Sequence, residues 1–454
     1  MAGLKADGAR PSLALVTDLY ELTMAEAYLR AGETGMATFS LSIRRLPPTR
    51  RYLVVAGLEE ALDYLESLRF TAEDIAFLRG TGRFSEDLLG YLRELRFRGD
   101  VRAVPEGRVV FAEEPLLEVT APIIEAQIIE TYLMNIIHLH TVLATKAARC
   151  VDAARGRAVV DFGLRRAHGL EAGMAAARAA YIAGCAATSN VAAGRRWGIP
   201  LSGTMAHSFV TAFPSELDAF RAYAHTYPDA TTLLIDTYDT LQGARHAVTV
   251  ADELARTGHR LRAVRIDSGD VLHLSREVRA ILDAGGHPEV QIFVSGGLDE
   301  YAIADLLDAG APIDGFGVGT RMDASEDAPT LEAAYKLVEY GGRPAFKLSP
   351  GKATLAGRKQ VWRRSGPDGR FAGDVIAAAD EVIADAEPLL VPVMAGGRRL
   401  RPPEPLDAIR ARCLAERDRL PDALRRIDGE GSYPVELSPR LRALQEEARE
   451  AAGV

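Results

Sequence analysis

The side chains that could do chemistry gather at the ends of short apolar runs in the middle of the chain. Seven such ends carry polar or glycine-rich sequences: Asp-Phe-Gly-Leu-Arg-Arg (161–166), Ser-Asn (189–190), Gly-Thr-Met-Ala-His-Ser (203–208), Asp-Thr-Tyr-Asp (236–239), Arg-Ile-Asp-Ser-Gly-Asp (265–270), Ser-Gly-Gly (295–297) and Gly-Val-Gly-Thr-Arg (317–321). In α/β barrels the carboxyl ends of the strands and the loops that follow them form the active-site face. The pattern therefore predicts an active site made from successive strand ends.

Two of these ends are typical of a phosphate site. Ser295, Gly296 and Gly297 precede a helical pattern, and Gly319 and Thr320 follow the next apolar run. Glycine lets backbone amides approach an anion closely, and a helix N-terminus adds a favourable dipole. Either motif alone is a weak signal because glycine-rich turns are common. Two adjacent ones favour phosphate binding, an arrangement that α/β barrels use on their last strands.

Charged side chains at three neighbouring ends suit an anionic sugar substrate. Arg265 and Asp267 alternate on one run, so both point to the same face of a strand. They form either a structural ion pair or a substrate site, with the arginine on an anionic group and the aspartate on sugar hydroxyls or metal-bound diphosphate. Asp236 lies at the same level, where it either stabilises cationic character or caps the next helix.

His207 is the histidine that we single out among nine. It follows a run of small residues, with Thr204 and Ser208 beside it, so its ring can face an open site. A lone histidine is more often a surface or core residue, as we expect for His138 and His140 in a long apolar helix. Position at the rim favours a chemical role for His207.

The elements that must position these residues alternate between strand and helix. The candidate strands are Ala158–Phe162, Cys185–Asn190, Leu201–Met205, Thr231–Asp236, Leu261–Asp267, Val290–Ser295 and Gly315–Val318. Most of their starts lie roughly 25–30 residues apart, the period of successive βα units. Seven candidates in one run favour an irregular α/β barrel, and a doubly wound open sheet is the structural alternative.

The flanking segments read differently and indicate a second, mixed α+β domain. Residues 36–56 and 100–120 alternate apolar with polar positions around a helical patch at 58–90, and β-like patterns return after Ala333. We expect residues 1–120 to form the N-terminal part of this domain. Residues 121–335 form the barrel with a leading helix over 122–155, and residues 336–454 supply the C-terminal part and a helical tail.

Composition narrows the class of protein. The 454 residues carry 54 Lys plus Arg against 63 Asp plus Glu, a net charge of −9, which leaves no basic footprint for nucleic acid or an anionic membrane. The three cysteines (Cys150, Cys185 and Cys413) are far apart, so neither a disulfide framework nor a paired zinc motif is expected. Without an export signal or an apolar run of spanning length, we expect a cytoplasmic protein.

Longer motifs resemble one family, the nicotinate phosphoribosyltransferases. They include TDLYELTM (17–24), FSLSIRRLP, IIETYLMNIIHLHTVLATKAAR (128–149), DFGLRRAHG (161–169), GTMAHSFV (203–210), IDTYDT, RIDSGD, the Gly-Val-Gly-Thr turn and PLLVPVM. The resemblance implies an irregular barrel with a domain built from both termini. It also implies a homodimer with active sites at the subunit interface. The implied reaction joins nicotinate to phosphoribosyl diphosphate, with ATP as co-substrate and Mg²⁺ on the diphosphate, in NAD biosynthesis.

The same resemblance implies roles for individual residues. His207 resembles the histidine that ATP phosphorylates, and Tyr20 of the neighbouring subunit and Phe162 resemble the residues on either side of the pyridine ring. Thr204 and Arg265 resemble nicotinate contacts, with Arg165 close by, and Asp236 and Asp267 resemble residues around the ribose. The 5-phosphate cradle is implied at four positions, with Ser295 beside them: Gly296, Gly297, Gly319 and Thr320.

Two departures and three rival functions bear on this reading. The chain lacks the cysteines of the C-terminal metal site that some members carry. It has Met205 where relatives that use nicotinamide have an acidic residue, which favours the acid as substrate. The rivals are a nicotinamide or quinolinate phosphoribosyltransferase, a phosphate-binding barrel oxidoreductase or isomerase with Cys185 as nucleophile, and a non-catalytic pyridine-nucleotide sensor.

Overall fold

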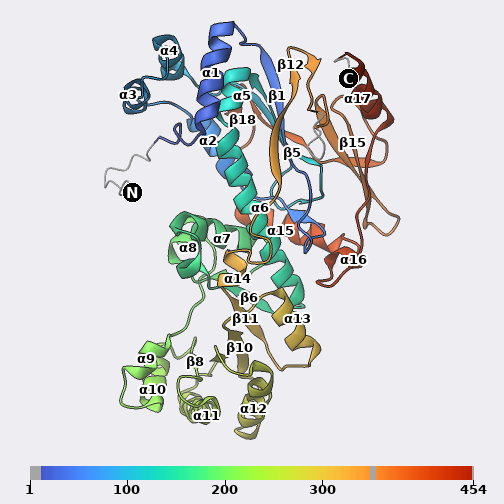
Figure 1. Ribbon diagram of the computed structural model, residues 1–454. Coiled ribbons are helices and arrows are strands. Elements are labelled where there is room, and N and C mark those ends of the chain that lie inside the picture. The colour runs from blue at the N-terminus through green and yellow to red at the C-terminus, as the bar shows by residue number, and fades with distance from the viewer. Residues whose placement is uncertain (1–11, 348–353, 452–454) are drawn as a thin grey trace.

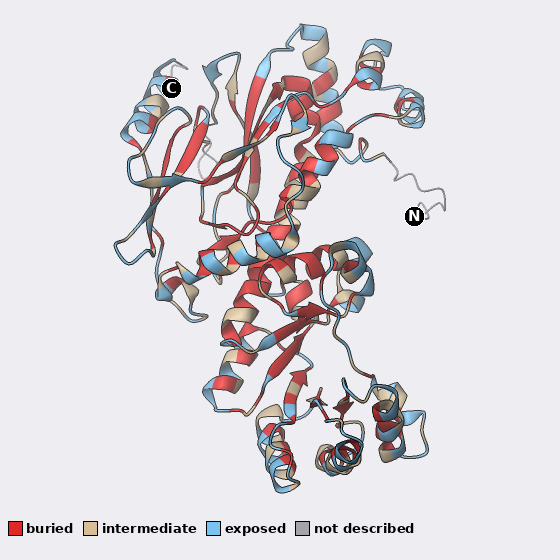
Figure 2. Ribbon diagram, turned by 180° about the vertical axis from the view of Figure 1, so that it is seen from behind, coloured by how far each residue is buried: buried red, intermediate tan, exposed pale blue. Residues whose placement is uncertain are grey.

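A computed structural model describes residues 12–347 and 354–451. The chain forms two lobes, and the long helix α6 (Glu130–Ala153) runs from one into the other (Figure 1). One lobe contains segments from both ends of the chain, and the other contains the central third. Figure 2 shows that the central strands of both lobes and much of α6 are buried. The fold is therefore the expected α/β barrel lobe combined with a mixed α+β lobe.

A six-stranded parallel sheet forms the core of the central lobe. Its order is β7 (Ala187–Thr188), β6 (Ala158–Asp161), β11 (Gly315–Val318), β10 (Gln291–Ser295), β9 (Ala263–Ile266) and β8 (Thr232–Leu234). Leu201 extends the sheet beyond β7 by a single parallel bridge to Thr188. Among the described residues no backbone pairing joins β8 to the segment at Leu201. The barrel is therefore incomplete, which confirms the predicted irregular α/β barrel.

The predicted strand Leu201–Met205 is the main difference from expectation. Only Leu201 pairs with a neighbouring strand, and residues 202–206 have no regular secondary structure. The segment instead makes side-chain and carbonyl contacts with Arg265, described below. The strand signal in these residues was weak because the segment contains Gly203 and several polar residues.

Helices connect the strands of this lobe, and aspartates start three of them. Asp239, Asp270 and Asp299 accept hydrogen bonds from backbone N–H groups at the first turns of α11 (Thr240–Arg256), α12 (Val271–Ala284) and α13 (Glu300–Asp308). The remaining helices are α7 (Leu170–Ile182), α8 (Val191–Trp197), α9 (His207–Thr211), α10 (Glu216–Thr226) and α14 (Thr320–Asp323). Each short cap fixes the loop that leaves a strand end.

The mixed lobe is centred on a sheet that both ends of the chain build. Its order is β13 (Arg343–Pro344), β12 (Ala333–Tyr340), β1 (Met36–Ile43), β5 (Pro115–Pro122), β3 (Asp100–Ala103), β17 (Val391–Ala395) and β18 (Arg398–Arg399). The central strand β1 pairs antiparallel with β12 on one side and β5 on the other. The two termini therefore fold as one unit.

Smaller elements complete this lobe. A second sheet has the order β16 (Ala386–Pro388), β14 (Lys359–Ser365), β15 (Phe371–Ala378) and β19 (Val435–Leu437), and β2 (Leu53–Val54) pairs with β4 (Val109–Val110). The helices are α1 (Leu19–Ala31), α2 (Leu58–Ser67), α3 (Ala72–Gly80), α4 (Glu86–Glu94), α5 (Ile123–Ile128), α15 (Leu406–Asp418), α16 (Asp422–Arg425) and α17 (Pro439–Ala451).

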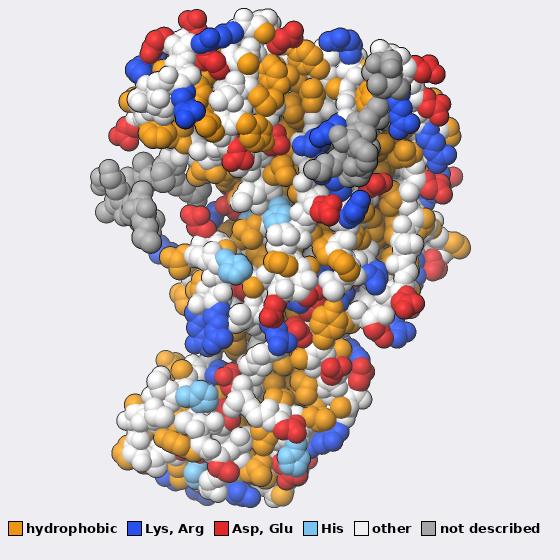
Figure 3. Space-filling view, viewed as in Figure 1, with side chains coloured by type: hydrophobic (Ala, Val, Ile, Leu, Met, Phe, Trp, Pro, Cys, Tyr) orange, Lys and Arg blue, Asp and Glu red, His pale blue; other side chains and the backbone are white. Residues whose placement is uncertain are grey.

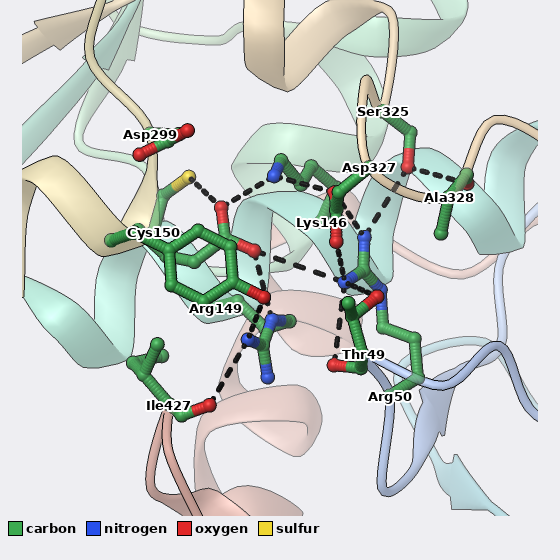
Figure 4. A network of polar contacts seen from close by, with 12 residues as sticks. Thr49, Arg50, Lys146, Arg149, Cys150, Asp299, Ser325, Asp327, Ala328 and Ile427 are labelled. Atoms are coloured by element: carbon green, nitrogen blue, oxygen red, sulfur yellow. Dashed lines mark hydrogen bonds and ion pairs between the residues drawn. The ribbon is translucent and has the colours of Figure 1, made fainter.

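A buried ionic network joins the two lobes at the start of α13 (Figure 4). The Lys146 ammonium on α6 lies 2.5 Å from Glu300 and 2.7 Å from Asp327, and Arg149 contacts Glu300 at 2.9 Å. Arg50, from the mixed lobe, pairs with Asp327 at 2.6 Å. Arg50, Lys146 and Glu300 are at most 1% exposed. Removal of one partner would therefore leave a buried charge without compensation and lower the free energy of unfolding by about 3–5 kcal/mol.

The surface carries charges of both signs. On the face shown in Figure 3, acidic and basic side chains alternate, with no continuous basic area. Among the described residues no helix is long and apolar enough to cross a membrane.

Candidate active site at the barrel rim

Hydrogen bonds tie the ends of β8, β9 and β10 into one acidic group. The Asp267 N–H donates to Asp236 Oδ2 over 3.0 Å, and the Ser268 hydroxyl donates to the same oxygen over 2.6 Å. The Ser295 hydroxyl donates to Asp267 Oδ1 over 2.5 Å. Asp236 Oδ1 is buried and has no hydrogen-bond partner among the described residues. The N-cap of the next helix, α11, is Asp239 and not Asp236. Asp236 is therefore available for a ligand at the rim.

Arg265 reaches from β9 across the open side of the barrel. Its Nη1 donates to the Thr204 hydroxyl over 2.5 Å and its Nη2 to the Met205 carbonyl over 3.1 Å, while Nε has no acceptor. No ion pair joins it to Asp267 among the described residues, so the structural ion-pair interpretation does not hold. Burial lowers the pKa of Arg265, and the carboxylates of Asp267 and Asp236 oppose this shift. A guanidinium desolvated in this way favours an anionic ligand.

His207 is the first residue of α9 and lies beside the loop that follows β8. Its Nδ1 is 3.1 Å from the Thr237 hydroxyl, and its ring is half-buried. This contact occupies Nδ1, and no hydrogen bond to Nε2 is found in the described part of the chain. Sequence reasoning missed Thr237, although it directly follows Asp236 in the IDTYDT motif.

The first glycine turn depends on its lack of side chains. Gly296 has φ 91°, and a Cβ there would lie 2.0 Å from the Asp267 carbonyl oxygen. Gly297 has φ 63°, and a Cβ there would meet nothing within 4 Å, so its backbone faces open space. Ser295 is buried while both glycines are exposed. The turn thus presents backbone to solvent at the start of α13.

The second glycine turn lies between β11 and α14 and contacts the first. Gly319 and Thr320 begin α14, and Arg321 pairs with Asp299, the cap of α13, at 2.9 Å. The structure therefore brings Ser295, Gly296 and Gly297 into the same rim as Gly319 and Thr320.

Phe162 covers the end of β11. A Cβ on Gly317 would lie 2.6 Å from its ring, and the Phe162 N–H donates to the Val318 carbonyl over 2.8 Å. Phe293 packs against it with ring centroids 6.0 Å apart. The ring is half-buried, and Arg165 lies exposed in the 3₁₀ turn that follows (Leu164–Arg166). An aromatic side chain therefore lies next to the second glycine turn, and no ion pair of the described residues involves the exposed Arg165.

Tyr20 is the predicted site residue that the chain does not bring to this rim. It lies on α1 in the mixed lobe, away from β8, β9 and β10 (Figure 1), and its side chain is 45% exposed. Burial of its ring and the nearby Glu130 carboxylate raise the pKa of Tyr20. Within one copy of the chain, Tyr20 takes no part in the site.

The cysteines do not support the oxidoreductase alternative. All three are buried, and Cys185 is 1% exposed. Burial raises the pKa of the Cys185 thiol, which keeps it protonated and a poor nucleophile. Within the described ranges, no three His, Cys, Asp or Glu side chains group closely enough to hold a metal ion.

Comparisons with known proteins relate most of this chain to one family. Models of the nicotinate phosphoribosyltransferase N-terminal domain, family domain and C-terminal domain match residues 15–138, 157–349 and 382–445. The nicotinate phosphoribosyltransferase pncB2 of Mycobacterium tuberculosis is 52% identical over 94% of this chain and 92% of its own. The Bacillus subtilis nicotinate phosphoribosyltransferase is 44% identical over 83% and 79%.

A solved structure extends the likeness to the fold. The crystal structure of human nicotinic acid phosphoribosyltransferase matches 95% of this chain and 99% of its own, with 31% identity and a TM-score of 0.86. A nicotinate-nucleotide pyrophosphorylase from Pyrococcus furiosus follows with 26% identity and a TM-score of 0.74. Domain models, sequence relatives and fold agree, and the chain belongs to the nicotinate phosphoribosyltransferase family.

Proposed function

We propose that this protein joins nicotinate to 5-phosphoribosyl 1-diphosphate, coupled to ATP hydrolysis, in NAD biosynthesis. The observation that carries the proposal is the partly buried Arg265, held by Thr204 beside the Asp236–Asp267 group and the two glycine turns. Such a rim offers a cation for a carboxylate, carboxylates for a sugar and open backbone for a phosphate. These are the three chemical groups that the two substrates present.

Nicotinate fits the basic and aromatic part of the rim. A guanidinium binds a carboxylate through two parallel hydrogen bonds, so Arg265, with Arg165 nearby, recognises the acid group. The Phe162 ring provides one aromatic face for the pyridine. Met205 is apolar and buried, and its thioether is only a weak acceptor for a carboxamide N–H₂, unlike a carboxylate. This combination favours the acid over the amide.

The phosphoribosyl group fits the acidic part and the glycine turns. Gly296, Gly297, Gly319 and Thr320 bind the 5-phosphate through their backbone, while Asp267 and Asp236 face the ribose. The pyridine nitrogen forms a bond to C1 as the C1–oxygen bond to diphosphate breaks, and the carboxylates stabilise the positive charge that develops on the sugar. The pyridine nitrogen has no proton to lose, so no general base is assigned.

Mg²⁺ fits the oxygen donors of this rim. Asp236 Oδ1 is buried without a hydrogen-bond partner, and carboxylate oxygen is the ligand type that Mg²⁺ prefers. Asp236 and Asp267 would hold the ion together with the diphosphate of the substrate. The ion would neutralise charge on the leaving group.

ATP coupling is assigned to His207. Because Thr237 occupies Nδ1, we expect the γ-phosphoryl group of ATP to be transferred to Nε2, with ADP released and the phosphoryl group later passed to water. Phosphohistidine would add negative charge beside Asp236. This charge would attract the metal ion and so order the diphosphate of phosphoribosyl diphosphate that the ion binds. Its hydrolysis would then loosen product binding.

A second copy of the chain would complete the site by supplying Tyr20 as the other aromatic face. Exposed apolar side chains surround the start of α1, where Leu13, Val16 and Leu19 are 37%, 43% and 51% exposed. Leu170, Val191 and Leu201 near the barrel rim are 76%, 67% and 54% exposed. A two-fold homodimer that covers both areas, with α1 of each copy against the barrel rim of the other, would place each Tyr20 over the partner's Phe162.

The test of the phosphohistidine is a variant that cannot accept phosphate. With γ-labelled ATP, the wild type should acquire acid-labile label, and His207→Asn should acquire none and lose ATP stimulation while it keeps ATP-independent turnover. His273→Asn, which changes an exposed histidine on α12, is the control and should behave as wild type. Full ATP-stimulated turnover by His207→Asn would refute the role of His207.

A further inference from the structure

A pair of buried carboxyls lies directly beneath the turn that carries Phe162. Asp161, the last residue of β6, is 1% exposed, and Asp323, the last residue of α14, is 4% exposed. The two carboxyls adjoin, close enough for a hydrogen bond when one of them carries a proton, and otherwise neither oxygen of Asp323 has a partner among the described residues. The proposed function uses neither of them, and no Lys, Arg or His of the described chain pairs with either.

The two carboxyls have different partners. Asp161 accepts the Gly163 N–H over 2.8 Å through Oδ1 and the Thr188 hydroxyl over 2.6 Å through Oδ2. No N–H group of the described residues donates to either oxygen of Asp323. Two ionised carboxylates cannot share a buried site without a cation, so one is neutral. The two donors at Asp161 stabilise its ionised form, which leaves Asp323 as the neutral acid that donates.

The pair also has little room to move. A Cβ on Gly163 would lie 2.1 Å from the Asp323 carboxyl, so Asp323 occupies the space that a side chain at 163 would need. Phe162, one residue earlier, rests on Gly317 and hydrogen-bonds to Val318. Asp323 ends the same short helix whose first residue is Thr320. The carboxyl pair therefore links the Phe162 turn to the second glycine turn.

We propose that Asp323 is a positioning residue which, through a hydrogen bond to Asp161, holds Phe162 in place relative to the Gly319–Thr320 turn. It touches neither substrate and acts through Asp161 and Gly163. Burial and the neighbouring Asp161 raise the pKa of Asp323, in agreement with a proton that stays on this carboxyl at neutral pH. The proposal rests on the proposed nicotinate site, because Phe162 is assigned there to the pyridine ring.

The kinetic test compares two substitutions at one position. Asp323→Asn keeps a neutral donor of the same shape, and Asp323→Leu removes the donor while it keeps the branching of the side chain. We expect Asp323→Asn to keep the KM for nicotinate within about twofold. Asp323→Leu should raise this KM by about tenfold or more, with a smaller change in kcat, since displaced positioning groups weaken alignment strongly.

A second carboxyl pair provides a matched control. Glu114 is fully buried next to Asp374 in the mixed lobe, and burial together with Asp374 raises the pKa of Glu114. This pair differs from the first in that Arg363 pairs with Asp374 at 2.6 Å. Glu114→Gln and Glu114→Leu repeat the same chemistry away from the rim. They should change thermal stability and leave the KM for nicotinate unchanged. If Glu114→Leu raised the KM for nicotinate as much as Asp323→Leu does, the effect of Asp323 would be a general loss of stability. That result would overturn the proposal.

Infrared spectroscopy of the substrate-free protein reports the proton directly. At neutral pH, Asp323→Asn should remove a protonated-carboxyl band, and Glu114→Gln should remove a different one. If Asp323→Asn kept every protonated-carboxyl band, the proposal would be overturned. This measurement does not require Asp323→Leu to fold.

Wild-type turnover of nicotinate is measured first. Its absence would contradict the proposed function, whereas equal KM values for Asp323→Asn and Asp323→Leu would contradict only the positioning role.

Discussion

Arg265 shows how one residue combines anchoring with recognition. Two of its donors are fixed by Thr204 and Met205, which set the plane of the guanidinium, and its Nε remains without an acceptor. Lysine has a single point charge on a flexible stem and cannot reproduce this planar fork. The charge alone therefore does not account for the proposed recognition of a carboxylate.

Replacement of Arg265 by lysine should change the KM for nicotinate and leave the KM for phosphoribosyl diphosphate nearly unchanged. A hydrogen bond to a charged group contributes about 1.5–3 kcal/mol, so we expect the KM for nicotinate to rise about 10- to 100-fold in Arg265→Lys. The KM for phosphoribosyl diphosphate should change little. Arg262→Lys, at an exposed position just before β9, is the control. An unchanged nicotinate KM in Arg265→Lys would show that the carboxylate binds elsewhere.

Sequence reasoning at this scale found residues that stand in motifs and missed those that act through contacts. Arg265, Asp236, Asp267 and His207 were identifiable because each follows an apolar run, and the structure places them at one rim. Thr237 and Asp323 were not singled out, because a threonine or aspartate carries no signal of its partner in space. The 3.1 Å contact between Thr237 and His207 appears only when the start of α9 folds against the loop after β8.

At the scale of elements, the turn from β10 to α13 does the most to shape the phosphate site. Ser295 anchors it to Asp267, Gly296 lies against the Asp267 carbonyl, and Asp299 caps the helix and pairs with Arg321. Glu300, the next residue, belongs to the ionic network that reaches the mixed lobe. The turn is therefore fixed on both sides.

A methyl group at Gly296 should disturb this turn far more than one at an open glycine. Gly296→Ala would clash with the Asp267 carbonyl, and we expect a large rise in the KM for phosphoribosyl diphosphate. Gly310→Ala is the control: Gly310 also has positive φ, 71°, but a Cβ there meets nothing within 4 Å. It should cost about 1 kcal/mol of stability and leave KM unchanged. Equal KM values for phosphoribosyl diphosphate in both variants would contradict close packing of Gly296 in the turn from β10 to α13.

The order of strands and helices could be predicted because apolar runs and helical periods alternate regularly in residues 158–318. The structure departs from prediction at Leu201–Met205, where contacts with Arg265 replace strand pairing. The Lys146–Glu300 pair was also not predictable, since its partners are 154 residues apart and each reads alone as an ordinary charged residue.

At the scale of the whole molecule, the two lobes place complementary parts of the proposed site far apart in one copy. The termini share a sheet through β1 and β12, which fixes α1 and Tyr20 to the mixed lobe. The patterns at both ends indicated a common domain, because β-like alternation returned after Ala333. The position of Tyr20 relative to the barrel could not be deduced from periodicity, which describes elements and not their packing.

A mixing experiment tests whether two copies share each site. Tyr20→Ala and His207→Asn should each be impaired alone in ATP-stimulated turnover. After joint unfolding and refolding, mixed dimers would contain one intact site, so about a quarter of wild-type activity should return for a closed two-fold dimer. Refolding of each variant by itself is the control. No recovery in the mixture would contradict a site shared between subunits.

The most direct test of the central claim is a turnover assay of the purified protein with phosphoribosyl diphosphate, Mg²⁺ and ATP. Nicotinate, nicotinamide and quinolinate are offered separately, and mononucleotide and ADP are followed together. We predict product from nicotinate, stimulated by ATP, and none from the other two. Turnover of nicotinamide or quinolinate in its place would contradict the assignment of Arg265 and Met205 to recognition of the acid.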